Sequence, residues 1–586
     1  MSEANVSKPL SDILRVGNCS GFYGDRLSAM RELLEGAKNG QSIDVITGDY
    51  LAELTMMILG KDQLKDSSLG YARTFVSQVT DCLDLALESG VRIVANAGGL
   101  NPAGLVDKLT EVAEGLGLSP RIAWVDGDNL APRAAELALG GALTANAYLG
   151  GFGIARALDA GADIVVTGRV TDASVVVGPA IWRFGWTPEQ YDELAGAVVA
   201  GHVIECGTQA TGGNFSGFLD LPRDDRPLGF PIAEISADGS SVITKHAGTG
   251  GLVSVDTVTA QLMYEVQSEH YFGPDVTVDL TSVELAPDGD DRVRVSGVRG
   301  QAPPPQLKVC VNELGGFRNQ MEFVLTGLDI EAKAAWLRAQ LEGRIDAASV
   351  TWSMGRPPAP DSETEEGASC LLRCVVKDAS AATAGKAFTS VAVELALGSY
   401  PGFTMTAPPA PASPYGVYRA AYVDRDLVTH TVHLPDGSTE VIPDPPVARQ
   451  PEVETKEDLH VPPVIGGVPE EAITRRIPLG TFVYARSGDK GGDANVGLWV
   501  RAGDRQAEQA QWLTHFVSVD RVRQLVPEAE DLDIEVFALP NLYGVNILIH
   551  GLLGDGVAAS TRFDPQAKGL GEWLRSRLVS IPEELL

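Results

Sequence analysis

Short apolar runs that end in polar loops recur along the first 235 residues. In the stretch 153–174, Ile154, Ala157 and Leu158 are spaced as on one face of a helix, and residues 164–166 then form a continuous apolar run. Such a run is typical of a buried strand. Comparable runs end in the loops 15–26, 44–53, 92–104, 121–129, 163–174 and 202–214. Strands alternating with helices at this spacing predict right-handed βαβ crossovers and a doubly wound, mostly parallel sheet, hence an α/β fold over residues 1–235.

The pattern changes after residue 235. Residues 236–435 hold strand-like segments with few helices between them, which predicts an α+β region with an antiparallel sheet. Residues 436–476 are rich in proline and acidic residues, so we expect a solvated linker there. Residues 477–586 return to a strand, helix and strand pattern, with a helix predicted at 519–525. They predict a small C-terminal α+β domain of the split-βαβ type.

The composition limits which kinds of molecule the protein can bind and where it can be located. The 586 residues carry a formal net charge of −32, which disfavours broad contact with nucleic acid or an anionic membrane. The N-terminus lacks a signal-like apolar core and no run of eighteen apolar residues occurs, so we expect a cytoplasmic protein. The six cysteines include no CxxC pair, which argues against a disulfide framework and a structural zinc site. Large α/β proteins often self-associate, and we expect a homo-oligomer.

The loops after the predicted strands carry polar side chains that would converge on one edge of the sheet. Asn, Asp and Gly are common there simply because they cap helices and form turns. Arginine, tyrosine, glutamate and glutamine are not preferred turn residues, so together the set predicts a polar pocket. Its members are Asn18, Cys19, Ser20, Asp25, Arg26, Asp49, Tyr50, Asn96, Asn101, Asp126, Asp128, Arg169, Asp172, Glu205, Gln209 and Asn214.

Two further loops combine basic residues with glycine. The first contains Lys245, His246 and Gly250, and the second contains Arg486 and Lys490. In so acidic a chain, such loops are where a phosphate or carboxylate would bind. The alternative is that each is a glycine-rich turn or hairpin without a ligand.

Familiar cofactor and nucleophile motifs are missing. The loop at Gly17 lacks the GxGxxG spacing, no GxxxxGK[ST] occurs, and no GxSxG elbow surrounds Ser20. No cofactor is therefore identified. His202 and Glu205 are three residues apart, and on the strand predicted there they would point to different faces. We accordingly predict no metal site.

Several long segments resemble one protein family. The segments NCSGFYGDR, DVITGDYLAELTM, NAGGLNP, TGRVTDAS, RSGDKGGDANVG and PNLYGVNILIHGLLGDGV look like the acyclic terpene utilisation AtuA family. The resemblance implies a large N-terminal family domain to about residue 450 and a ferredoxin-like AtuA domain from about residue 475. It also implies a role beside acyl-CoA carboxylases and hydratases in the catabolism of geranyl-CoA and citronellyl-CoA, and it assigns no catalytic residue.

These observations together predict an enzyme that acts on a branched or isoprenoid acyl-CoA, as a hydratase or lyase. Such chemistry needs a group that moves a proton and donors that hold an enolate oxygen. Asp25, Asp49, Glu205 and His246 are candidates for the first role, and Asn18 and Asn96, with backbone amides near Gly98 and Gly212, for the second. Lys245, Arg486 and Lys490 would hold CoA phosphates or a substrate carboxylate.

Two other functions remain open from the sequence. The first is a non-catalytic partner of an acyl-CoA carboxylase or hydratase, in which the polar loop residues merely cap helices. The second is a hydrolase or hydroxy-acid enzyme without CoA, with Cys19 or Ser20 as nucleophile.

Overall fold

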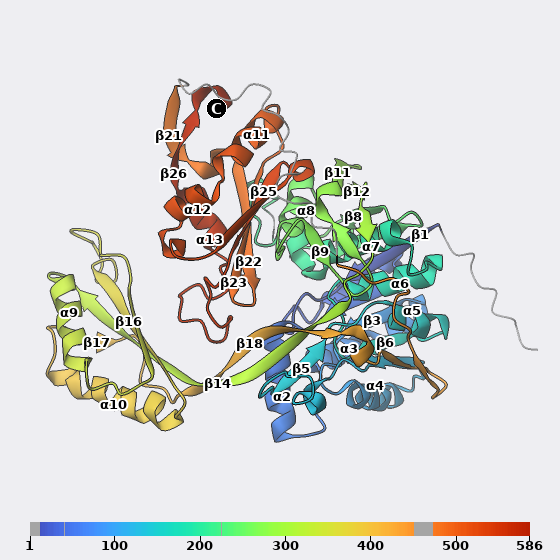
Figure 1. Ribbon diagram of the computed structural model, residues 1–586, viewed down its shortest axis with the longest axis horizontal. Coiled ribbons are helices and arrows are strands. Elements are labelled where there is room, and N and C mark those ends of the chain that lie inside the picture. The colour runs from blue at the N-terminus through green and yellow to red at the C-terminus, as the bar shows by residue number, and fades with distance from the viewer. Residues whose placement is uncertain (1–11, 40, 224, 451–472) are drawn as a thin grey trace, which may run out of the picture. The chain divides into compact units, whose positions relative to one another are not determined.

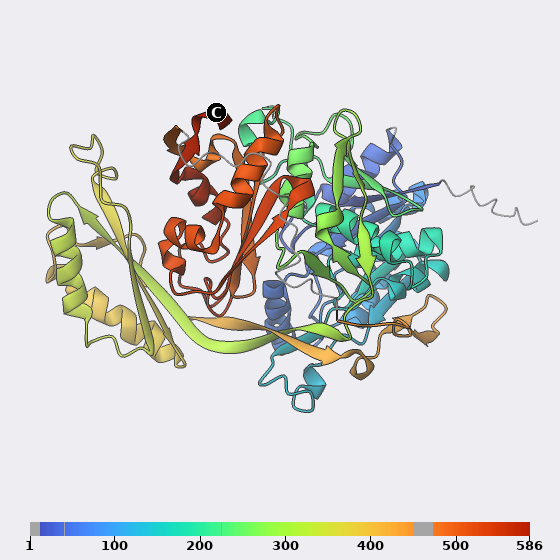
Figure 2. The ribbon, with the colours of Figure 1, turned by 45° about the horizontal axis from the view of Figure 1, so that its top comes forward.

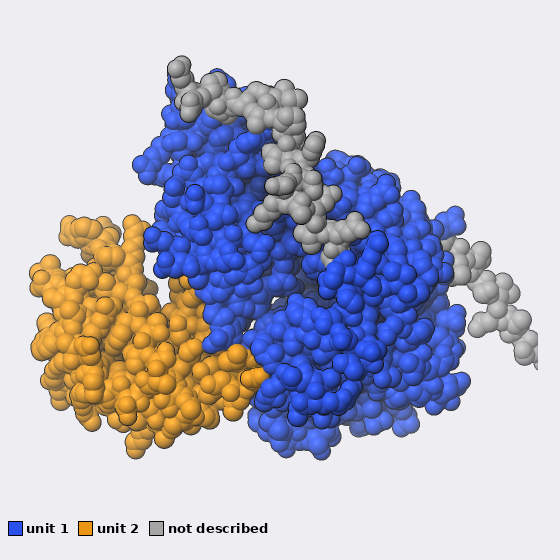
Figure 3. All heavy atoms as spheres, in the orientation of Figure 1, with its two compact units in different colours: residues 1–312, 418–557, 566–586 blue, residues 313–417, 558–565 orange. Residues whose placement is uncertain are grey.

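The computed structural model describes residues 12–39, 41–223, 225–450 and 473–586. The chain divides into two compact units, coloured separately in Figure 3. Unit 1 comprises residues 1–312, 418–557 and 566–586, and unit 2 comprises residues 313–417 and 558–565. Part of the segment predicted as a linker, residues 451–472, lies outside the described residues. Within the described chain, no helix has the length and apolar character needed to cross a membrane.

A large mixed sheet forms the centre of unit 1 (Figure 1). Its central strands are parallel, in the order β1, β2, β3, β6 and β4, and antiparallel strands extend it on both sides. In sheet order the strands are β11 (Glu284–Pro287), β12 (Val293–Ser296), β8 (Ser241–Lys245), β7 (Pro231–Ser236), β1 (Ile13–Asn18), β2 (Val45–Asp49), β3 (Arg92–Asn96), β6 (Ile164–Thr167), β4 (Ile122–Asp126), β19 (Thr431–His433) and β20 (Thr439–Val441). The fold is thus mixed α/β, and β20 lies within the segment for which the sequence predicted a linker.

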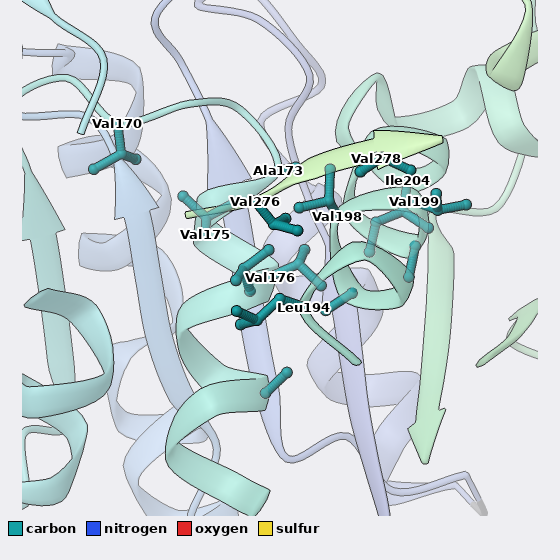
Figure 4. Close-up of a cluster of buried hydrophobic side chains, with 14 of the residues drawn as sticks. Val170, Ala173, Val175, Val176, Leu194, Val198, Val199, Ile204, Val276 and Val278 are labelled. Atoms are coloured by element: carbon teal, nitrogen blue, oxygen red, sulfur yellow. The ribbon is translucent and has the colours of Figure 1, made fainter. Parts of the chain in front are cut away.

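Both faces of the parallel strands are buried, because successive side chains point to opposite sides. Val45 and Val94 enter one apolar cluster, and their neighbours Ile46 and Ile93 enter another. The second cluster is closed by α1 (Ala29–Lys38), α3 (Arg73–Ser89) and α4 (Pro102–Leu116). The first is closed by α5 (Phe152–Asp159), α6 (Ser174–Phe184) and α7 (Tyr191–Glu205). Figure 4 shows some of its buried side chains, many of them valines, on α6, on α7 and at the strand β10 (Thr277–Asp279).

The helix-to-strand unit predicted at 153–174 is confirmed by α5 and β6. The strand predicted at the start of 202–214 is wrong, because that segment is the end of helix α7, followed by a 3-10 turn at Gly207–Thr211. Every residue of α7 from Leu194 to Glu205 is buried. A helix that is apolar on all sides shows no periodicity, so its sequence cannot be distinguished from a buried strand.

The rest of the N-terminal part of unit 1 adds short elements. They are α2 (Glu53–Lys65), β5 (Thr144–Ala147), α8 (Val255–Leu262), β9 (His270–Phe272) and β13 (Arg299–Gln301). Strands β9, β10 and β13 form a small antiparallel sheet. Strand β5 pairs with the beginning of the long strand β14 (Gln306–Thr326) instead of joining the large sheet.

The C-terminal segment builds a four-stranded antiparallel sheet with its own apolar core (Figure 2, orange to red). In sheet order its strands are β22 (Val483–Lys490), β23 (Asp493–Val500), β25 (Gly544–Ile549) and β24 (Ile534–Leu539). Its helices are α11 (Gln506–Phe516), α12 (Val519–Leu525) and α13 (Leu570–Ser576), and β21 (Thr474–Pro478) pairs with β26 (Leu578–Pro582). The helix predicted at 519–525 is confirmed.

Unit 2 has a separate apolar core between an antiparallel sheet and helices. Its elements are β14, β15 (Ser349–Met354), β16 (Ser369–Asp378), β17 (Thr404–Met405), β18 (Ser413–Asp424), α9 (Ile330–Leu341) and α10 (Phe388–Val393). Strands β14 and β18 also contain residues of unit 1. Cys370 and Cys374 lie on β16 and are both buried, so they act as small apolar residues on one face of a strand.

Candidate functional site

The carboxyl ends of the parallel strands carry a buried polar network. Asp49 is the last residue of β2, and its Oδ1 accepts hydrogen bonds from the Leu51 amide at 2.8 Å and from the Asn96 side-chain amide at 3.1 Å. Asn96 ends β3, and its Oδ1 accepts from Thr167 at the end of β6. Three neighbouring strand ends are therefore joined by side chains, and Asp49 is held in one position.

Arg169 adds a buried positive charge to this network. Its Nη1 lies 2.9 Å from Asp172 Oδ1 and 3.8 Å from Asp49 Oδ1, and its guanidinium stacks 4.6 Å from the centre of the Tyr148 ring. The Arg169 side chain is 2% exposed, whereas Asp172 is 26% exposed. Arg169 Nη1 is engaged in the ion pair with Asp172, whereas Nε has no hydrogen-bond partner in the described chain. The Nε donor can therefore serve a bound ligand.

Asp49 and Asp172 form a carboxyl pair whose two pKa values are shifted in opposite directions. Burial raises the pKa of Asp49 well above its usual range, and the nearby charge of Asp172 raises it further. Burial also acts to raise the pKa of Asp172, but Arg169 and a hydrogen bond from Asp49 outweigh it and lower that pKa. At neutral pH, Asp49 is then the acid that holds a proton and Asp172 is the ionised base.

Lysines from distant segments face this pair. Lys490 ends β22, its Nζ lies 3.6 Å from Glu265 Oε2, and its charge is attracted by Asp172. Lys308 on β14 lies 5.4 Å from the centre of the Tyr148 ring and 3.9 Å from Glu53 Oε1. Burial lowers the pKa of Lys308, and Lys490 lowers it further. The cluster thus mixes acids with cations that can hold an anionic substrate group.

His202 and Glu205 form a second acid–base pair beside the first. On α7 their three-residue spacing puts them on one face, with His202 Nδ1 3.1 Å from Glu205 Oε1. The prediction that they diverge is wrong, because they lie on a helix and not on a strand. Burial raises the pKa of Glu205 to about 7, although His202 opposes the shift. His202 Nε2 and Glu205 Oε2 have no hydrogen-bond partner within the described residues.

The second basic loop also joins the site through Arg486. Arg486 Nη2 donates to Gln209 Oε1, and the guanidinium lies 4.4 Å from the centre of the Tyr264 ring. Lys568 approaches the same ring at 4.6 Å. Gln209 and Arg486 therefore lie together where the C-terminal sheet meets the loop after α7.

The other candidates of the first two loops fill structural roles. Asn18 donates to the carbonyls of Ile204 and Glu205 at 2.9 Å, which caps the end of α7. Asp25 accepts from the amides of Gly21 and Arg26, and so shapes its own turn. The remaining contacts are Ser20 Oγ to the Phe22 carbonyl, Arg26 to Glu32 and to the Phe230 ring, and Tyr50 to Gln78.

The first basic loop and two further residues lie outside the charged cluster. Lys245 pairs with Asp291 at 2.9 Å and donates to the Thr249 carbonyl, and His246 contacts the Gln41 carbonyl. Gly250 forms a β-bridge with Leu228. Asn101 caps α4, and Asp126 pairs with His433. No contact in the described part of the chain links these residues to Asp49 or Asp172.

Three residues of the cluster were not singled out from the sequence. Glu265 follows the end of α8, Lys308 lies on the extended β14, and Tyr148 follows β5. None belongs to a motif, because each reaches the cluster only through tertiary packing. One sequence signal could have identified Lys308, because it is a charged residue inside an apolar strand pattern.

The fold and site define a mixed α/β protein with a desolvated cluster of acids and cations at the carboxyl ends of its parallel strands. The model of the acyclic terpene utilisation family protein AtuA matches residues 14–434, and that of the AtuA ferredoxin-like domain matches residues 477–580. The chain belongs to this family, whose description is one of acyclic terpene utilisation, and its C-terminal domain is ferredoxin-like. Comparison with curated proteins gave no match.

Proposed function

We propose that the protein is a hydratase or lyase acting on a branched or isoprenoid acyl-CoA, and that Asp49 and Asp172 carry the proton transfers. The observation that supports this best is the carboxyl pair whose pKa values are shifted in opposite directions beside Arg169. One carboxyl that keeps its proton and one that has lost it make an acid and a base in a single site. The family's description, acyclic terpene utilisation, supports the substrate class.

The proposed dehydration uses both carboxyl groups. Asp172, the more exposed of the two, accepts the proton from the carbon next to the thioester carbonyl, and Asp49 donates its proton to the departing β-hydroxyl, which leaves as water. The proton then passes from Asp172 to Asp49, which restores the starting state. Hydration is the same sequence in reverse. A lyase would use the same two groups to move protons on either side of a carbon–carbon bond.

The enolate oxygen formed in this step needs donors. Asn18 is committed to the end of α7, and Asn96 donates to Asp49, so neither amide is available. Arg169 Nε is buried and lacks a hydrogen-bond partner within the described residues, and we assign it this role. Lys490 and Arg486 would hold a substrate carboxylate or the CoA phosphates.

A cysteine or serine nucleophile has less support. Burial raises the pKa of Cys19 to about 12, so its thiol stays protonated and unreactive. Ser20 Oγ donates to the Phe22 carbonyl instead of to a base.

The proposal also covers partners and location. We propose that the chain self-associates, that it works in one pathway with an acyl-CoA carboxylase, and that it is located in the cytoplasm.

The mass of the acyl group after incubation with the protein distinguishes the proposed function from its alternatives. The purified protein is incubated with branched 3-hydroxyacyl-CoA and 2-enoyl-CoA thioesters, and the acyl mass is followed over time. Loss or gain of one water supports a hydratase, and two smaller carbon fragments support a lyase. Release of the free acid would indicate a hydrolase. No turnover together with tight binding to an acyl-CoA carboxylase would indicate a non-catalytic partner, and either of these last two outcomes overturns the proposal.

A further inference from the structure

A cavity of about 380 Å³ lies in unit 1, and its wall includes neither carboxyl of the Asp49–Asp172 pair. Its apolar wall is formed by Phe152 of α5, by Ile181 and Trp182 of α6, by Trp186, and by Leu307 of β14. Small-molecule sites in proteins have this size, and they combine an apolar, aromatic wall with a few polar groups. The apolar wall suits the body of a small aliphatic or aromatic molecule.

One of the polar groups in the wall is a buried arginine. Arg425 is 8% exposed, its Nε donates to the Pro304 carbonyl, and its Nη2 donates to the Pro274 carbonyl, both at 2.7 Å. Asp275 and Asp444, which also line the cavity, attract it only at longer range, and the Asp275 carboxylate accepts from the Gly151 amide. Among the described residues, Arg425 takes part in no ion pair within 4.0 Å. A buried cation without an ion pair is costly, and its usual partner is a carboxylate.

A buried histidine completes the polar part of the wall. His430 lines the cavity, and its Nε2 has no hydrogen-bond partner in the described residues. Burial lowers the pKa of His430 to about 4, so the ring is neutral at physiological pH. It therefore offers one hydrogen bond to a ligand without adding charge.

The cavity and the charged cluster lie on opposite sides of one wall. Leu149 and Leu307 line the cavity, whereas their neighbours in sequence, Tyr148 and Lys308, face the cluster and contact each other there. Neighbouring residues of an extended chain point to opposite sides. A ligand in the cavity is thus separated from Asp49 and Asp172 by this wall.

We propose that this cavity is a second binding site, which takes a small monocarboxylate with an aliphatic or aromatic body. The carboxylate binds Arg425, and the apolar body lies against Trp182 and Trp186. Nothing in the proposed acid–base reaction uses these residues. The site therefore stands independently of that reaction.

Titration calorimetry on the full chain tests the proposal with octanoate as the probe. We expect one octanoate bound per chain, at least tenfold weaker binding of octan-1-ol, which keeps the body but lacks the charge, and no measurable binding of acetate. Equal affinity for octanoate and octan-1-ol would overturn the assignment to Arg425. This comparison uses the wild-type protein and does not depend on the folding of any variant.

Two variants locate the site. Ala155→Phe fills the cavity from α5 and is expected to abolish octanoate binding, and Arg425→Gln is expected to weaken it at least tenfold. Arg449→Gln is the matched control, because Arg449 is an exposed arginine that does not line the cavity. Asp172→Asn should leave octanoate binding unchanged. Unchanged binding to a folded Ala155→Phe, or loss of binding in Asp172→Asn, would place the ligand elsewhere and contradict the proposal.

Discussion

The two basic, glycine-rich loops of this chain look alike in sequence but differ in what surrounds them. In the loop at 245–251, Lys245 pairs with Asp291, and His246 contacts the Gln41 carbonyl. In the loop at 486–495, Lys490 lies 3.6 Å from Glu265 and is attracted by Asp172, and Arg486 donates to Gln209. The first loop satisfies its own polar groups, whereas the second brings its charges to a shared cluster.

The difference shows that a basic residue beside glycine does not by itself predict an anion site. Whether such a residue can contribute to an anion site depends on whether neighbouring elements already pair with its positive charge. The second loop is a hairpin of the C-terminal sheet that meets segments from the N-terminal part of unit 1, so its cations reach acids far away in sequence. The following changes test this contrast.

The largest effect is expected from Asp172→Asn, which removes the base that Lys490 faces. General acid–base catalysis contributes roughly 10² to 10⁴ in rate, so turnover of the acyl-CoA should fall by about that factor. Asp291→Asn, which removes the acid opposite Lys245, is the control and should leave turnover within about twofold, since this pair has no contact with Asp49 or Asp172 in the described part of the chain. Circular dichroism verifies the folding of both variants. Equal losses in the two variants would show that the contrast between the loops is false.

Replacing the lysine of each loop should separate binding from stability. Lys490→Met should raise the KM for the acyl-CoA about tenfold to a hundredfold, because a cation near the substrate is lost. Lys245→Met should leave KM unchanged and lower the free energy of unfolding by about 1 kcal/mol, because Asp291 is partly exposed and screened. Urea denaturation and steady-state kinetics measure the two quantities. A KM effect in Lys245→Met would assign that loop to the site.

The pH dependence of kcat should follow the two shifted carboxyls. Activity needs Asp172 ionised and Asp49 protonated, so the acid limb lies below the usual aspartate pKa of 3.8 and the alkaline limb lies well above it. Asp49→Asn should remove the alkaline limb and lower the maximum. An unaltered alkaline limb in a folded Asp49→Asn would assign that limb to another group.

The smallest effect is expected from His246 in the first loop. Burial lowers its pKa below 6.5, so the folded state holds fewer protons there than the unfolded state. The stability of the protein should therefore fall as the pH drops below 6.5, and His246→Gln should make this decline shallower. Melting temperatures between pH 7 and pH 5 measure the slope, with kcat at pH 7 unchanged. A slope identical to that of the wild type would mean that His246 is not desolvated.

The local patterns predict much of the fold but less of the site. The helix and strand at 152–167 and the helix at 519–525 follow from their periodicity. The burial of α7 on all sides removed its periodicity, so the pairing of His202 with Glu205 could not be foreseen. Asp49, Arg169 and Asp172 could be proposed because strand ends meet at one edge of a sheet. Glu265 and Lys308 could not, because only long-range packing brings them to that edge.

The exchange of the proton next to the thioester carbonyl tests the central claim most directly. A branched acyl-CoA is incubated in deuterium oxide with the wild-type protein and with Asp172→Asn, and deuterium on that carbon is measured by mass spectrometry. The account predicts rapid incorporation with the wild type and a loss of about 10² or more in the variant. Incorporation at the same rate in both proteins, or in neither, would contradict the assignment of Asp172 as the base.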